Sequence, residues 1–176
     1  MISRRYIHIF CGTGEGKTSA ALGKGLREAS EGKSVVLIQF LKERQSGESM
    51  DFFKRLEPEI KLFRFQKFPE NYENLTEREK EDEIQNIKNG LNFAKKVLVT
   101  EECDVLILDE ILGLTDKGIV RFEELHSLID AVGDDTELYL TGTSRCEALW
   151  PYVDEVTELN TSYRAGSNIS IDKTIE

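Results

Sequence analysis

The segment Gly12–Ser19, with the sequence GTGEGKTS, has the composition of a phosphate-binding loop. Glycines allow backbone N–H groups to turn toward phosphate oxygens, the start of a helix adds partial positive charge, and Lys17 adds a full one. The hydroxyl of Thr18 is of the type that ligates magnesium in such loops. The segment is one residue shorter than the usual G-x-x-x-x-G-K-[ST] pattern, because Cys11 stands five residues before Gly16.

The alternative is a glycine-rich turn that precedes an ordinary helix. We favour a nucleotide site, because an apolar strand leads into the loop and Lys-Thr opens the helix. The side chain of Glu15 would repel phosphate, so we expect it to point outward. The residues predicted to contact the nucleotide are Gly12, Thr13, Gly14, Glu15, Gly16, Lys17, Thr18 and Ser19.

Two acids, Asp109 and Glu110, end the apolar run VLILDE. Ligands of open α/β sheets bind beyond the carboxyl ends of the strands, and an acid placed there beside a phosphate loop holds the metal directly or through water. The alternative is that these acids cap a following helix. Because the loop is present in the same chain, we predict a Mg²⁺ site formed by Thr18, Asp109 and Glu110.

Other polar and aromatic residues leave more than one interpretation open. The segment Thr141–Ser144 either lines the nucleotide pocket or forms a turn. Phe63 and Phe65 are predicted to pack in the core. Phe68 and Tyr72 fall in an irregular segment that could reach a substrate.

The elements that must position these residues alternate along the chain. The predicted strands are Tyr6–Cys11, Ser34–Phe40, Ile60–Phe65, Val105–Glu110, Glu137–Gly142 and Val156–Leu159. The predicted helices are Lys17 to about Ser30, Asp51–Leu56, a long helix after the capping box of Thr76 and Glu79, a helix from Phe122 to Val132, and a short helix capped by Ser144 and ended by Pro151. Continuous apolar strands are typical of a parallel sheet that is covered on both faces. The pattern predicts one α/β domain, residues 1–176, with a mostly parallel central sheet flanked by helices and a loosely ordered tail from residue 160.

The composition limits the class of protein. The chain has 176 residues, 39% of them hydrophobic, and a formal net charge of -10. Such an acidic chain is not expected to bind nucleic acid or an anionic membrane. Three cysteines without C-x-x-C spacing and two distant histidines predict neither a disulfide framework nor a zinc site. Because no apolar signal or membrane-length segment is present, we expect a cytoplasmic protein.

Several short motifs follow one another in a fixed order: GTGEGKTS, IQFLK at Ile38–Lys42, LDEI at Leu108–Ile111, and LTGT at Leu140–Thr143 followed by VDEVTEL at Val153–Leu159. Together they resemble the P-loop type of ATP:corrinoid adenosyltransferases, also called cob(I)alamin or cob(I)yrinic acid a,c-diamide adenosyltransferases. That family has the patterns G-N-G-K-G-K-T-T, V-Q-F-[IL]-K, L-D-E-[IL], and L-T-G-R followed by A-D-x-V-T-E-M. The short loop is therefore a trait of the family, and the resemblance implies a P-loop NTPase-like (RecA-like) fold.

The resemblance also implies a reaction. Members transfer the 5′-deoxyadenosyl group of ATP to the cobalt(I) of a corrinoid, with Mg²⁺ present, and release the triphosphate. It implies that Gln39 belongs to the nucleotide site and that Lys17, Phe68 and Arg145 serve in catalysis, Phe68 through contact with the corrinoid. A homodimer and an electron-donating reductase are the partners that it implies.

The chain departs from the family patterns at named positions. Thr13 and Glu15 replace the asparagine and the first lysine of the loop, Glu70 stands at a tryptophan position, and Thr143 replaces an arginine for which Arg145 could substitute. Two other functions therefore stay open. One is a nucleotide-binding sensor or partner protein that has lost the transfer reaction. The other is a conventional ATPase or kinase, against which the short loop argues.

Overall fold

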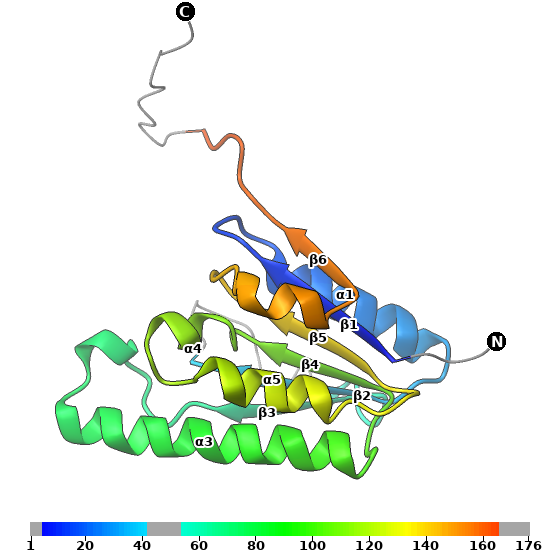
Figure 1. Cartoon of the computed structure of the whole chain (residues 1–176), viewed down its shortest axis with the longest axis horizontal. Coiled ribbons are helices and arrows are strands. Elements are labelled where there is room, and N and C mark those ends of the chain that lie inside the picture. Colours follow the sequence, from blue (N-terminus) through cyan, green and yellow to red (C-terminus); the bar gives the residue numbers. More distant parts are fainter. Residues whose placement is uncertain (1–4, 42–53, 166–176) are drawn as a thin grey trace, which may run out of the picture.

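The structure is a computed structural model that describes residues 5–41 and 54–165 (Figure 1). Its strands are β1 (Tyr6–Cys11), β2 (Val35–Phe40), β3 (Ile60–Phe65), β4 (Val105–Asp109), β5 (Glu137–Thr141) and β6 (Glu155–Glu158). Its α-helices are α1 (Lys17–Ser30), α3 (Glu77–Val99), α4 (Gly113–Asp116) and α5 (Phe122–Asp130), and its 3-10 helices are η1 (Tyr72–Asn74) and η2 (Glu147–Tyr152).

These strands form one six-stranded sheet in the order β3-β2-β4-β5-β1-β6. Every pair of neighbouring strands is parallel. The α/β class predicted from the sequence is therefore confirmed, and the described sheet is entirely parallel. Because all strands run the same way, their carboxyl ends meet at one edge, where ligands of such sheets bind.

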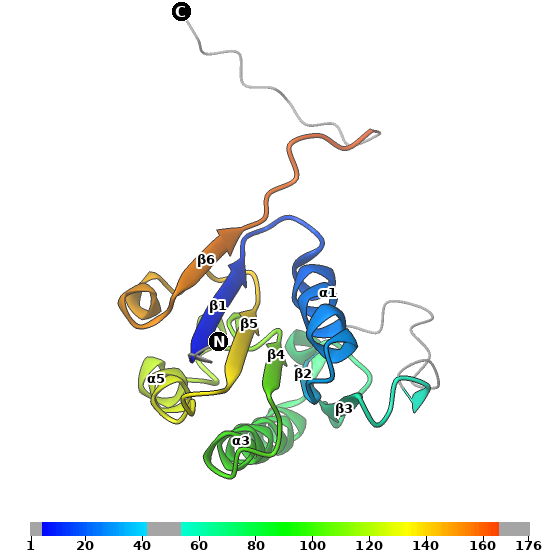
Figure 2. The ribbon, with the colours of Figure 1, turned by 90° about the vertical axis from the view of Figure 1, so that its right-hand side faces the viewer.

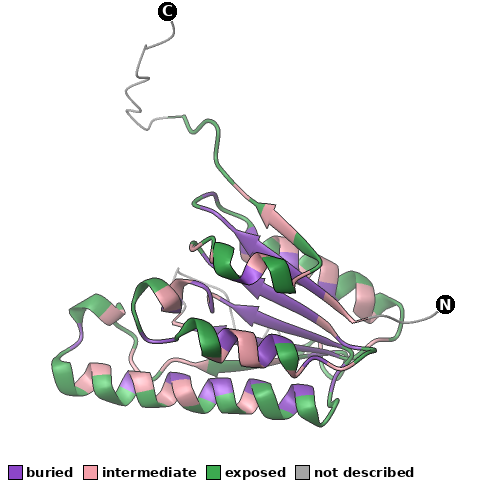
Figure 3. Ribbon diagram, viewed as in Figure 1, coloured by how far each residue is buried: buried purple, intermediate pink, exposed green. Residues whose placement is uncertain are grey.

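Helices cover both faces of the sheet (Figure 2). Helix α1 packs on one face over a cluster that includes Phe10, Leu37 and Ile107. Helices α3 and α5 cover the other face, over a larger cluster that includes Ile38 and Leu108. Strands β2 and β4 are buried at every position, as the purple ribbon of Figure 3 shows, and this explains why they have no alternating pattern.

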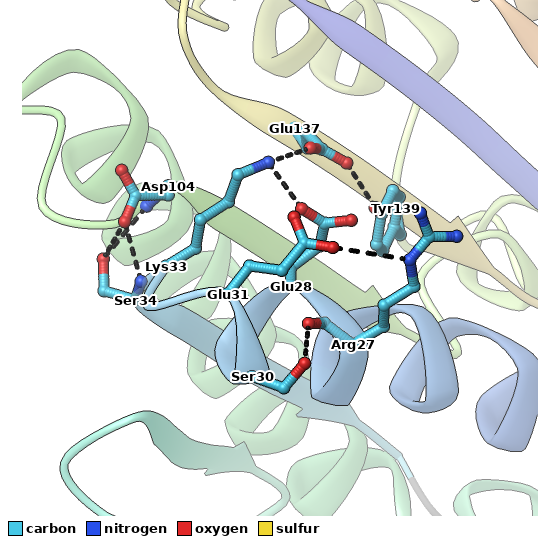
Figure 4. Close-up of polar contacts among 9 residues, drawn as sticks. All are labelled: Arg27, Glu28, Ser30, Glu31, Lys33, Ser34, Asp104, Glu137 and Tyr139. Carbon is cyan, nitrogen blue, oxygen red and sulfur yellow. Dashed lines mark hydrogen bonds and ion pairs between the residues drawn. The ribbon is translucent and has the colours of Figure 1, made fainter.

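The carboxyl end of α1 is held at the edge of the sheet opposite the phosphate loop (Figure 4). Gly32, with φ 89°, follows the helix, and the N–H of Lys33 donates to the carbonyl of Glu28 (3.1 Å), as in a Schellman motif. Lys33 Nζ also donates to the carboxylates of Glu137 (2.7 Å) and Glu28. These bonds raise the pKa of Lys33 above its ordinary value. The contacts fix one end of α1 against β5.

The long helix α3 begins and packs as the sequence predicts. Thr76 and Glu79 form the reciprocal capping box. Ile87, Leu91, Ala94 and Leu98 are buried on its inner face. Gly90 allows close approach to the sheet, because a Cβ atom there would lie 2.7 Å from the rings of Phe40 and Phe65.

Several predicted boundaries differ by one or two residues. Strand β2 begins at Val35, β4 ends at Asp109, β5 ends at Thr141, and β6 spans Glu155–Glu158 instead of 156–159. Helix α5 ends at Asp130, although Val132 is buried beyond it. The first half of the predicted helix at 51–56 lies outside the described residues, and residues 55 and 56 are in a turn. The short helix α4 was not predicted.

The predicted helix capped by Ser144 and ended by Pro151 is wrong. The segment is the 3-10 helix η2, which starts after Cys146 in a left-handed conformation with φ 44°. Ser144 Oγ contacts Cys146 Sγ at 3.4 Å and caps no helix. Pro151 lies inside η2, because its fixed φ suits a 3-10 turn.

The predicted core role of Phe63 is also wrong. Phe63 is 37% exposed, because β3 is an edge strand and the ring lies against Phe93 (centroids 4.7 Å apart) at the margin of α3. Phe65 packs against the core cluster as predicted. In the described ranges, none of the helices has the continuous apolar length that spanning a bilayer requires.

Candidate functional site

The phosphate-loop segment connects the carboxyl end of β1 to the start of α1. Gly12 and Gly16 have φ angles of 108° and 99°, which residues with side chains rarely adopt. Lys17 is buried, and its Nζ donates to the carbonyl oxygen of Gly14 at 2.6 Å. The loop thus folds around the ammonium group of its own lysine.

The chain that follows β6 supports this loop from outside. The N–H of Gly14 donates to the carbonyl of Leu159 at 2.8 Å. A Cβ atom at Gly12 would lie only 2.4 Å from the same carbonyl oxygen. The Gly14 amide is therefore bonded to Leu159 in this structure. Cys11 is buried beneath the loop, and burial raises the pKa of its thiol.

Asp109 is the centre of a buried hydrogen-bond network at the carboxyl edge of the sheet. Its Oδ1 accepts hydrogen bonds from the hydroxyls of Thr18 and Thr141, both at 2.7 Å. Its Oδ2 accepts one from Nε2 of Gln39 at 3.0 Å. The donors come from α1, β5 and β2, the two strands being the neighbours of β4 in the sheet. The fold therefore brings Thr18, Gln39 and Asp109 together.

Thr141 is the residue for which the sequence left a choice between pocket and turn. It is fully buried, bonds to Asp109, and its Oγ1 also accepts the N–H of Glu110 at 3.0 Å. Glu110 itself has a left-handed backbone with φ 64° and is half-buried. Thr143 is exposed. Within the segment Thr141–Ser144, Thr141 therefore belongs to the Asp109 network, whereas Thr143 lies at the surface.

Arg64, which was not predicted as a site residue, extends the network to the edge strand β3. Its Nε donates to Oε1 of Gln39 at 3.0 Å. Gln39 therefore connects Arg64 to Asp109 across two neighbouring strand pairs. Arg64 lies near the carboxyl end of β3, beside Gln39 of β2. This position identifies it as a site residue only once the strand order is known.

The two remaining predicted catalytic residues lie outside this network. Arg145 forms ion pairs with Glu147 (2.6 Å) and Glu158 (3.4 Å), and its guanidinium lies 5.0 Å from the ring centroid of Trp150. Phe68 is half-buried in the segment between β3 and η1. Its catalytic role and that of Arg145 stay predictions.

Residues near these positions have structural contacts. Tyr72, which the sequence places in a segment that could reach a substrate, packs partly against the core, with Lys80 and Lys117 about 6 Å above its ring (6.0 and 5.9 Å). Glu70 is exposed. Glu15 points outward as predicted and pairs with Arg164 at 2.7 Å.

The donor set at Asp109 fits a magnesium ion. The oxygens of Thr18 and Asp109 lie 2.7 Å apart, and both are the hard donors that Mg²⁺ prefers. Magnesium is typically held by one or two protein oxygens together with substrate phosphates. No group of three or more His, Cys, Asp or Glu side chains in the described ranges could hold a metal without such help.

The fold and the loop define a P-loop NTPase-like α/β protein. Among solved structures, the KaiC-like protein PH0186 from Pyrococcus horikoshii OT3 matches with a TM-score of 0.54 and 16% identity, over 92% of this chain and 75% of that one. At this identity the likeness shows the fold alone.

The family is more specific than the fold. The model of the ATP:corrinoid adenosyltransferase BtuR/CobO/CobP family matches residues 3–176, and the chain belongs to that family. Corrinoid adenosyltransferase CobA of Salmonella typhimurium (strain LT2) is 26% identical over 156 residues, covering 89% of this chain and 76% of the relative. A corrinoid adenosyltransferase of Pseudomonas aeruginosa is 24% identical over 176 residues, covering 98% and 84%.

Proposed function

We propose that this protein transfers the 5′-deoxyadenosyl group of ATP to the cobalt(I) of a corrinoid and releases triphosphate. Family membership and the names of the relatives support a corrinoid adenosyltransferase. The observation that carries the proposal is the network in which Asp109 accepts hydrogen bonds from Thr18 and Gln39 beside the Lys17 loop. These are the motifs by which the sequence resembles the family.

The proposed step is a nucleophilic substitution. Cobalt(I) attacks C5′ of the ribose, a cobalt–carbon bond forms, and the bond between C5′ and the phosphate oxygen breaks. The electron pair of that bond leaves with the triphosphate. Because no proton moves, the protein needs no general base and acts by placing the reactants and stabilising the charge of the leaving group.

The loop supplies the stabilising charge. Lys17 Nζ exchanges its bond to the Gly14 carbonyl for phosphate oxygens, and the first amides of α1 add partial positive charge. Thr18, Asp109 and Glu110 would hold Mg²⁺, with Gln39 and Thr141 fixing the Asp109 carboxylate. The ion, when bound, neutralises charge on the triphosphate.

On the corrinoid side, Phe68 contacts the substrate, as the family resemblance implies. It stands on the segment that follows β3, at the same edge of the sheet as the loop. Arg145 acts on the triphosphate only if it leaves Glu147 and Glu158.

A second candidate function is ATP binding without transfer, as in a sensor or partner protein. Two observations favour this function. Thr143 stands where the family pattern has an arginine, and Arg145, which could substitute for that arginine, is bound by the carboxylates of Glu147 and Glu158. In this case the Asp109 network would serve nucleotide binding alone.

The two functions are separated by mixing the protein anaerobically with Mg·ATP and chemically reduced cob(I)alamin. We expect a light-sensitive adenosylated corrinoid together with an equal amount of triphosphate. Bound, intact ATP with no change in the corrinoid, repeated with cobinamide, would exclude transfer and leave the second function. Rapid release of inorganic phosphate from ATP alone would instead indicate a conventional ATPase.

A further inference from the structure

Glu83 is a buried acid outside the nucleotide network. It lies in the second turn of α3 and, like Asp109, is 0% exposed. A carboxylate taken out of water is costly unless hydrogen bonds replace its hydration. The hydrogen-bond donors around Glu83 therefore indicate the role of this buried carboxylate.

Those partners are the backbone amides of the segment that carries Phe68. The N–H of Lys67 lies 3.0 and 2.9 Å from the two carboxylate oxygens, and the N–H of Phe68 donates to Oε2 at 3.0 Å. Asn86, one turn later on α3, donates to Oε1 at 3.2 Å. Two consecutive amides are thus fixed by one rigidly placed carboxylate.

A second bond holds the other side of Phe68. Nε2 of Gln66 donates to the carbonyl oxygen of Phe68 at 2.9 Å. The backbone of this residue is bonded through both its N–H and its carbonyl, while its ring stays only half-buried. Such an arrangement restrains the backbone from which the ring extends and leaves part of the ring accessible.

Attachment of β3 to α3 does not by itself require this carboxylate. The two elements already pack through Phe65 and the close approach at Gly90. An apolar residue at position 83 would bury surface there without the desolvation cost of an acid. The hydrogen bonds of Glu83 are specific to the peptide groups of residues 67 and 68.

We propose that Glu83 is a positioning residue that holds Phe68 in place for its contact with the corrinoid. This inference rests on the proposed function, and it adds a residue that acts through Phe68 without touching the substrate. The sequence did not indicate this role, because Glu83 lies in the acid-rich run EREKEDE, a composition typical of a solvated helix face.

The test is the variant Glu83→Gln, assayed for transfer at varied corrinoid and varied ATP. Glutamine keeps the size of the side chain but has an NH₂ group in place of one of the two acceptor oxygens, so a donor of Lys67, Phe68 or Asn86 loses its acceptor. We expect the KM for the corrinoid to rise on the order of 10-fold to 100-fold, as for a displaced positioning group. The Kd for Mg·ATP, measured by calorimetry, should stay within about twofold, because Glu83 is not part of the Asp109 network.

Two further variants separate positioning from general stability. Glu81→Gln is the matched control, because Glu81 makes the same substitution on α3 two residues earlier, at an exposed position. It should leave both constants unchanged. Gln66→Ala should raise the corrinoid KM in the same direction by a smaller factor, since it frees only the carbonyl of Phe68.

The decisive measurement is a double-mutant cycle with Phe68→Ala. If Glu83 acts through the ring, Glu83→Gln has little further effect once the ring is gone. An equal effect in both backgrounds, or parallel losses in corrinoid and ATP constants, would overturn the positioning role while the wild-type activity stands. A wild-type protein that binds ATP but adenosylates no corrinoid would overturn the proposed function, and this inference with it.

Discussion

The hydroxyl of Thr18, at the start of α1, donates a 2.7 Å hydrogen bond to Oδ1 of Asp109, 91 residues later in the chain. The same oxygen accepts the hydroxyl of Thr141. One buried carboxylate thereby joins the phosphate loop to two central strands. Replacing it affects both the metal-binding chemistry that we propose and the local fold.

We expect Asp109→Asn to lower the rate of transfer by on the order of 10-fold to 100-fold, as for other groups that hold or orient a metal ligand. The asparagine NH₂ would face donors, so unfolding free energy should also fall by about 1–3 kcal/mol. The measurement is the transfer rate as a function of Mg²⁺ concentration, with stability taken from urea unfolding.

Asp104→Asn is the matched control for that variant. Asp104 precedes the same strand at its opposite end and accepts hydrogen bonds from the N–H (2.7 Å) and hydroxyl (2.8 Å) of Ser34. Its replacement should leave the Mg²⁺ dependence unchanged. A normal Mg²⁺ dependence in Asp109→Asn would refute the metal role of this carboxylate.

Lys17 gives a second prediction. Lys17→Met removes the positive charge of the loop and should lower the rate of transfer by on the order of 10²- to 10³-fold, the usual effect of losing a group that stabilises developing charge. Lys33→Met, near the other end of α1, removes ion pairs with Glu28 and Glu137 and should lower stability only. Single-turnover transfer at saturating ATP distinguishes the two variants. Wild-type rates in Lys17→Met would contradict the role proposed for the loop.

The fold could be predicted largely from the sequence. Continuous apolar runs such as Val35–Phe40 have a clear physical cause, because central strands of a parallel sheet are buried on both faces. The capping box of Thr76 and Glu79 and the glycine after α1 depend only on neighbouring residues, so the helix ends that they form can be predicted from the sequence. The edge strand β3 was located correctly, but the exposure of Phe63 depends on its neighbours.

The part of the site that could not be predicted depends on distant contacts. The motifs located Thr18, Gln39 and Asp109, but nothing local to Thr141 distinguishes a network residue from a turn residue. Arg64 and Glu83 contribute through partners whose positions follow only from strand order and helix placement. The prediction that Ser144 caps a helix is wrong for a local reason: Cys146 adopts a left-handed conformation, and no nearby residue type indicates it.

The glycines of the loop and helix form a matched pair for a third prediction. Gly12→Ala places a Cβ atom 2.4 Å from the carbonyl oxygen of Leu159 at a φ of 108°. We expect weaker ATP binding and a loss of about 1–3 kcal/mol of unfolding free energy. Gly23→Ala, in the middle of α1, meets nothing within 4 Å and should stabilise the protein by about 0.5–1 kcal/mol. Calorimetry of ATP binding and urea unfolding of both variants provide the check. Equal ATP affinity in the two would show that the close approach to Leu159 does not shape the site.

His8 gives a prediction about pH. The ring is 2% exposed, lies 2.8 Å from Lys24 Nζ through Nδ1, and contacts Thr157 Oγ1 at 2.8 Å through Nε2. Burial and the positive charge of Lys24 lower the pKa of His8 from 6.5 to about 4, against the weaker opposite effect of Glu155. Below pH 6.5, His8 therefore binds a proton in the unfolded chain, whereas in the folded protein it becomes protonated only near pH 4. The stabilisation is fully present above pH 6.5 and is lost as the pH falls toward 4.

We therefore expect His8→Phe, which keeps the stacking against Phe10 (centroids 3.9 Å apart), to flatten this part of the stability curve. The slope of unfolding free energy between pH 6 and 4.5, measured by urea unfolding, should decrease by up to about 1.4 kcal/mol per pH unit, the value for one proton. Lys24→Met removes the second cause of the shift and should give an intermediate slope. If the slopes of wild type and His8→Phe coincide, acid destabilisation arises from the carboxylates alone, and the buried histidine takes no part in it.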